Sequence, residues 1–104
     1  MGPELKCHAQ HKTPPTDESL LVSADKSLKG VLVRIVGKVE GDYPPPKEPA
    51  VLDQVGCIFI PHVMAVQLGQ PLLIKNGDDV AHNVRLNSTR NTSFNSIIPK
   101  KGDT

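Results

Sequence analysis

Short runs of aliphatic and β-branched residues, separated by turn residues, recur along the whole chain. In the first half they predict strands over residues 19–23 and 30–37, and Gly30–Gly37 has the clearest strand pattern because valine, leucine and isoleucine dominate between two glycines. In the second half, similar runs predict strands over residues 50–53, 56–60, 62–67, 71–75, 80–86 and 93–98. Strands spaced about 8–12 residues apart with turns between them are typical of an all-β sandwich or barrel.

Polar and proline-rich stretches interrupt this pattern. Residues 1–18 are polar and contain Pro14-Pro15, so we expect a loosely held N-terminal segment ahead of a domain over residues 19–104. The prolines of residues 43–49 predict an extended, polyproline-type crossing. The run Asn76-Gly77-Asp78-Asp79 is a strong turn signal, because Asn-Gly favours a positive φ.

Composition narrows the function classes. The 104 residues fit one domain, and the net charge of +1 without clustered lysine or arginine gives no reason to expect nucleic acid as a partner. No apolar run approaches the roughly 20 residues that a membrane-spanning helix needs. The sequence has no nucleophile elbow, no phosphate-binding glycine loop and no paired histidines at helical spacing, so it does not predict an enzyme.

The cysteines and histidines are the candidate chemistry. Cys7 and Cys57 are the only two cysteines, and counting alone leaves open whether they form a disulfide or remain two unrelated thiols. The segment Cys7-His8-Ala9-Gln10-His11 suggests a zinc- or copper-binding tail. Zinc needs about four ligands, so this tail would need a distant partner. A solvated segment with one structural cysteine is the plainer interpretation.

An ordered set of short motifs runs from Gly56 to Asn95. It comprises Gly-Cys-x-Phe-x-Pro-His-Val, Val66-x-x-Gly69-Gln70, Asn76-x-Asp78, His82-Asn83-Val84 and Asn91-x-x-Phe94-Asn95. The set resembles the cupredoxin superfamily of plastocyanin- and azurin-like proteins, and is closest to the bacterial secreted branch often labelled methylamine-utilisation or plastocyanin-like. The resemblance covers about residues 20–104 and implies a Greek-key β-sandwich.

The resemblance also implies a metal site. His82, on the strand after the Asn-x-Asp turn, corresponds to the first copper ligand, and Asn83 corresponds to an asparagine that ties the ligand loops together. Asn76 and Asp78 would form the turn that places His82. In the family the remaining Cys, His and Met ligands lie on a later loop, whereas this sequence reaches Thr104 without them. We therefore expect a cupredoxin-like domain that is truncated at its C-terminal end.

The same resemblance favours a Cys7–Cys57 disulfide and hence a periplasmic or extracellular location. The expected function is copper-binding electron transfer, with a redox protein or a larger assembly as the partner. The alternative is a metal-free structural or interaction module, in which an unpaired strand edge docks onto another chain. The Cys7-His8-His11 tail site is a third hypothesis, and His62 has no assigned role.

Overall fold

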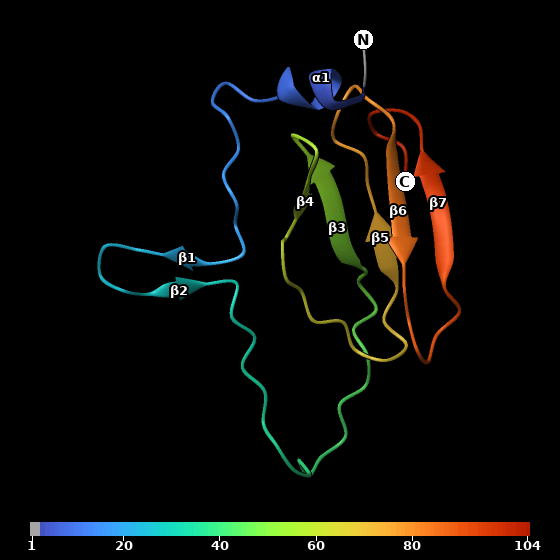
Figure 1. The fold of residues 1–104 in the computed structure, drawn as a ribbon. Helices are drawn as coiled ribbons and strands as arrows, with labels where there is room; N and C mark the ends of the chain where they lie inside the picture. The colour runs from blue at the N-terminus through green and yellow to red at the C-terminus, as the bar shows by residue number, and fades with distance from the viewer. Residues whose placement is uncertain (1–2) are drawn as a thin grey trace.

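The computed structural model describes residues 3–104, and short strands dominate it (Figure 1). One helix, α1 (Pro3–His8), precedes the strands. The strands are β1 (Leu21–Val22), β2 (Leu28–Lys29), β3 (Ala50–Val55), β4 (Ile58–Ile60), β5 (Leu72–Ile74), β6 (His82–Leu86) and β7 (Phe94–Ile98). The predicted all-β class is confirmed, and α1 was not expected from the polar N-terminal pattern.

The strands form three small sheets. β1 and β2 make a separate antiparallel pair. β3 is the centre of a second sheet, in the order β4-β3-β5, where β4 runs antiparallel and β5 parallel to it. β6 and β7 form an antiparallel pair whose register joins His82 to Ile98 and Leu86 to Phe94. Pairing of β3 with the distant β5 brings the turn that follows β5 next to the β3–β4 hairpin.

The sheets of β3 and β6 face a common cleft of about 300 Å³. Leu52, Leu72 and Ile74 line it from the first sheet, and Val84, Leu86 and Phe94 line it from the second.

Apolar burial is small in this molecule. Val84 and Ile98, at 5% and 7% exposure, are the buried hydrophobic side chains of the described part of the chain. Three polar side chains are equally buried: Gln54, Asn76 and Asp78. Buried polar groups must be hydrogen-bonded to be tolerated, so the interior of this protein is organised by polar contacts.

Two predicted strands are wrong. Residues 30–37 and 62–67 form no strand, although the first has the clearest strand pattern in the sequence. Val33 is 88% exposed and Ile35 is 77% exposed. A strand exists only when a neighbour supplies its hydrogen bonds, and within residues 3–104 neither segment has such a neighbour.

Candidate metal centre

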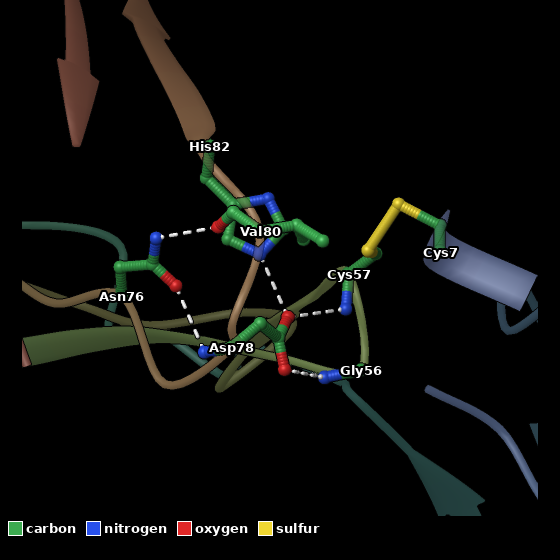
Figure 2. Close-up of a disulfide and its surroundings, with 7 residues drawn as sticks. All are labelled: Cys7, Gly56, Cys57, Asn76, Asp78, Val80 and His82. Carbon is green, nitrogen blue, oxygen red and sulfur yellow. Dashed lines mark hydrogen bonds and ion pairs between the residues drawn. A yellow bond between two sulfur atoms is a disulfide. The ribbon is translucent and has the colours of Figure 1, made fainter. Parts of the chain in front are cut away.

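Asp78 is the centre of a buried cluster at the end of the β3–β4 hairpin (Figure 2). Its Oδ1 accepts a hydrogen bond of 2.7 Å from the backbone N–H of Gly56. Its Oδ2 accepts one of 2.7 Å from the N–H of Cys57, and lies 2.7 Å from Nε2 of His82. One carboxylate therefore joins the hairpin turn to the first residue of β6.

These contacts decide the charge state of Asp78. Burial raises the pKa of its carboxyl group, but the hydrogen bonds from the Cys57 N–H, the His82 ring and the Gly56 N–H together outweigh burial. The pKa of Asp78 is therefore lowered overall, and the group is a carboxylate at neutral pH.

The turn that Asp78 holds has an unusual backbone. Gly56 and Cys57 connect β3 to β4 with φ values of 63° and 59°, both in the left-handed region. Two left-handed residues match the twist of a two-residue hairpin, and they turn successive N–H groups towards one acceptor. A side chain with a Cβ rarely adopts this conformation, so Cys57 depends on the contacts of its N–H and its sulfur.

Asn76 fixes the turn that carries Asp78. It is 1% exposed, and its Nδ2 donates to the carbonyls of Val80 at 2.8 Å and Ile98 at 2.9 Å. Its Oδ1 accepts from the N–H of Asp78 at 2.8 Å. These three bonds tie the loop to itself and to the end of β7, which sets where the carboxylate points.

Backbone contacts complete the support of this loop. Gln54 accepts at its carbonyl from the N–H of Gly77 at 2.8 Å and donates from Nε2 to the Lys75 carbonyl at 3.2 Å. The Asn76 N–H donates to the Asp103 carbonyl at 3.1 Å. β3, the turn after β5 and the C-terminal residues thus meet at one point.

One ring nitrogen of His82 contacts Asp78, and the other ring nitrogen does not. Its side chain is 10% exposed, and an ionised carboxylate can only accept, so Nε2 carries the proton shared with Asp78. Nδ1 lies on the side of the ring away from Asp78 (Figure 2) and has no hydrogen-bond partner among residues 3–104. Histidines that bind metals commonly have this arrangement, with the second nitrogen held by a carboxylate.

The disulfide between Cys7 and Cys57 is confirmed, with a Cα–Cα distance of 5.7 Å across 50 residues of sequence. It joins α1 to the hairpin turn (Figure 2). Both cysteines, His8 and His11 line a pocket of about 350 Å³. His11 is so close to Gly56 that a Cβ there would lie 3.1 Å from Cε1 of the imidazole. His11 thus lies against the hairpin turn, but the disulfide removes the Cys7 thiolate that the tail hypothesis requires.

A cluster that the sequence did not predict includes Cys57 itself. One ligand atom each from Cys57, Asp78 and His82 lie within 4.8 Å of one another. From the sequence, Asp78 was expected only in the turn that places His82, and Cys57 only as a disulfide partner. The sequence signal for this cluster is the Gly56-Cys57 pair between two apolar runs. Such a pair forms a hairpin turn whose successive N–H groups bind an anionic acceptor such as a carboxylate.

The other predicted residues lie elsewhere. Asn83 follows His82 on β6, so it points to the opposite face, and its Nδ2 donates to Oδ1 of Asn95 on β7 at 2.6 Å. Asp79 is exposed, 3.9 Å from Nζ of Lys101. His62 is exposed and borders the inter-sheet cleft. Of the four residues predicted for the site, the structure brings together Asn76, Asp78 and His82, and leaves Asn83 in a separate contact.

No family model, curated protein or solved structure matches this chain. Within residues 3–104 no helix is both long and apolar enough to cross a bilayer.

Proposed function

We propose that this chain is part of an extracytoplasmic, cupredoxin-like protein that binds copper and transfers electrons, with Nδ1 of His82 as a copper ligand. The observation that carries the proposal is the Asp78–His82 pair at 2.7 Å, which fixes the ring and leaves the other nitrogen as a lone-pair donor. Asn76 and Asp78 act as positioning residues in this proposal. The Cys7–Cys57 disulfide supports an oxidising compartment.

Rigid support of the ligand suits electron transfer. The carboxylate of Asp78 has three hydrogen bonds of its own, and Asn76 fixes the backbone that carries it. A ligand held in this way changes position little when the metal changes oxidation state. A blue-copper site also needs a thiolate, a second imidazole and a weak axial ligand. The sulfur of Cys57 is in the disulfide, so the proposal takes these ligands from polypeptide that follows Thr104.

The first test uses the chain as it stands, with its disulfide intact. Substoichiometric Cu²⁺ is added while the imidazole resonances of His8, His11, His62 and His82 are followed by NMR. We expect paramagnetic broadening of the His82 resonances and of neighbouring residues in β6. In His82→Gln, the β6 residues should no longer be broadened. Broadening confined to His8 and His11 would contradict the assignment and favour the tail site.

The second test uses a longer form of the chain that includes residues after Thr104. Copper should produce an intense visible band from thiolate-to-copper charge transfer, and His82→Gln should abolish it. His62→Gln is the matched control, because His62 is an exposed histidine outside the Asp78 cluster. A longer form that binds copper with full intensity after His82→Gln would refute the ligand assignment.

A metal-free interaction module is the second candidate, and the inter-sheet cleft favours it. The cleft is lined by apolar residues from β3, β5, β6 and β7, and Phe59 and Phe94 beside it are 43% and 38% exposed. Exposed apolar surface of this kind is typical of a docking surface for another chain or chain segment. This candidate predicts slower amide exchange in β5 and β6 in the longer chain than in the isolated one, without any copper-dependent change.

A further inference from the structure

The disulfide blocks a potential metal site. Cys57, Asp78 and His82 offer a sulfur, an oxygen and a nitrogen within 4.8 Å of one another, and the sulfur is bonded to Cys7. Thiolate, imidazole and carboxylate are the three side-chain ligands that Zn²⁺ uses in proteins. Asp78 is 3% exposed and the His82 side chain 10%, so a metal bound here would be largely withdrawn from water.

We propose that reduction of the Cys7–Cys57 disulfide creates a Zn²⁺ site made of Cys57, Asp78 and His82, so that the bridge is a redox gate on zinc binding. The inference does not rest on the copper proposal, because it concerns the reduced chain and needs no ligand outside residues 3–104. A three-ligand zinc site keeps its fourth position open for water or a small anionic ligand.

The chemical step balances with a dithiol reductant. The dithiol gives two electrons and two protons, the S–S bond breaks, Cys7 and Cys57 become thiols, and the reductant becomes a disulfide. Zinc then binds the Cys57 sulfur, whose proton leaves to solvent, and takes the place of the proton between Nε2 of His82 and Oδ2 of Asp78. That ring proton moves to Nδ1, so the imidazole stays neutral. One thiolate and one carboxylate neutralise the two charges of Zn²⁺, which favours the metal in a buried place.

The geometry allows the site to close once the bridge is open. Zinc bonds of about 2.0–2.3 Å place tetrahedral ligands roughly 3.3–3.8 Å apart. Nε2 of His82 and Oδ2 of Asp78, now 2.7 Å apart, therefore have to separate by roughly 0.6 Å, and the Cys57 sulfur has to approach them by about 1 Å. Rotation of the freed Cys57 side chain can supply this movement. Asp78 stays in place, because its bonds to the Gly56 and Cys57 N–H groups do not depend on the disulfide.

The test compares Cys7→Ser with Cys57→Ser. Both variants lose the disulfide and keep one thiol, so they differ in whether the cysteine beside Asp78 remains. Co²⁺ serves as a spectroscopic probe for Zn²⁺. We expect Cys7→Ser to give a thiolate-to-cobalt band and tetrahedral d–d bands without reductant, and Zn²⁺ to displace the cobalt. Oxidised wild type and Cys57→Ser should give neither band.

Zinc affinity measured by competition with a chromophoric chelator gives the magnitude. Loss of partners outside a coordination shell already lowers metal affinity about 10- to 100-fold, so we expect at least about a hundredfold weaker binding in Cys57→Ser than in Cys7→Ser. In the Cys7→Ser background, His82→Gln should remove the cobalt bands and His62→Gln should keep them. Equal bands in Cys7→Ser and Cys57→Ser would overturn the proposal, because the ligands would then be the tail residues.

The proposal can still be tested if a variant fails to fold. The same spectra are taken on wild type whose bridge has been opened by a phosphine reductant. A metal that binds the folded state stabilises it, so a chain that remains unfolded in saturating Zn²⁺ also overturns the proposal. The copper proposal is judged on the oxidised chain, where the Cys57 sulfur is not a ligand. Either proposal can therefore fail without the other.

Discussion

Two regions of this chain are stabilised in opposite ways. The polar cluster, which comprises Gln54, Gly56–Cys57, Asn76–Asp78 and His82, contains no large apolar residue, yet Asn76 and Asp78 are 1% and 3% exposed. The open segment, residues 30–49, contains Val31, Leu32, Val33, Ile35 and Val36, and each of these is at least 60% exposed. The hydrophobicity of a segment therefore does not determine whether its side chains are buried in this molecule.

Hydrogen-bonding partners explain the difference. The side chains of Asn76 and Asp78 satisfy backbone groups that are far apart in sequence, such as the N–H of Cys57 and the carbonyl of Ile98. No buried side-chain nitrogen or oxygen in the described part of the chain lacks a partner. The open segment has apolar side chains but no strand to pair with. Its apolar side chains are therefore not buried against a neighbouring sheet and contribute little to stability. The polar cluster is held in place because its buried polar atoms are all hydrogen-bonded.

The largest expected effect comes from opening the disulfide. Its 50-residue separation gives a loss of about 4 kcal/mol in the free energy of unfolding in the chain-entropy model. Urea unfolding with and without reductant, in the presence of a chelator, measures it. A loss below about 1 kcal/mol would mean that the polar cluster holds its geometry without the bridge.

Asp78→Ala should cost about 3 kcal/mol or more. The substitution removes the acceptor of two backbone N–H groups and of His82, and bonds to a charged group contribute about 1.5–3 kcal/mol each. Asp79→Ala is the matched control, since Asp79 is exposed and should change stability by less than about 0.5 kcal/mol. Equal losses in the two variants would show that Asp78 does not anchor the turn.

Ile98→Ala should cost about 2 kcal/mol, while Ile97→Ala should cost less than about 0.5 kcal/mol. The two residues are adjacent on β7, but Ile98 is 7% exposed and Ile97 is 70% exposed. Chemical denaturation of both variants compares apolar burial with the polar contacts directly. A loss for Ile98→Ala above that for Asp78→Ala would reverse the order proposed for the two kinds of contact.

Acid should weaken the polar cluster. The pKa of Asp78 is lowered from its ordinary value of 3.8, so its contribution is complete above about pH 4. It is lost as the pH falls through the lowered value, because the folded chain then has to take up a proton that the unfolded chain already binds. Unfolding curves between pH 6 and about pH 2 should show this loss, and Asp78→Asn should flatten the dependence where Asp79→Asn does not.

The smallest effect is expected in the open segment. Val33→Thr and Ile35→Thr should each change the free energy of unfolding by less than about 0.5 kcal/mol, because both side chains are mostly exposed. Limited proteolysis should cut within residues 30–49 before it cuts near Asp78. Strong protection of this segment from protease would show that it is packed against something in solution.

The sequence predicted part of this picture and missed the rest for physical reasons. Local signals were sufficient to place a bend after β5 and the runs that became β3 to β7, because turn residues and apolar alternation are properties of neighbours. The positive φ predicted for Asn76-Gly77 is absent, and the hydrogen bonds of the Asn76 side chain shape this loop instead. The strand over residues 30–37 was wrong because pairing depends on a partner, which the pattern of one segment does not contain.

The same limit applies to the site. The pairing of Cys7 with Cys57 and the placing of His82 by the Asn76–Asp78 turn both followed from the resemblance, and the hydrogen bond between Asp78 and His82 was not predicted. The role of Cys57 beside Asp78 depends on β3 and β5 running parallel, which brings two distant turns together. Alternation along β6 would have placed Asn83 on the opposite face from His82, had it been applied to that pair.

The hydrogen-bond partners of Asn76 also determine when its loop can fold during synthesis of the chain. Its buried amide and backbone bond to Ile98, Gly102 and Asp103, which are made more than twenty residues after it. While the ribosome still holds those residues, Asn76 can bond to Val80 but not to the end of β7, and the loop with Asp78 and His82 stays incomplete. A nascent chain released or stalled before Asp103 would therefore have all its cysteines and histidines but not the full set of contacts that supports the polar cluster. Maturation of this site is in that sense a post-translational event, even though every residue that forms it was translated earlier.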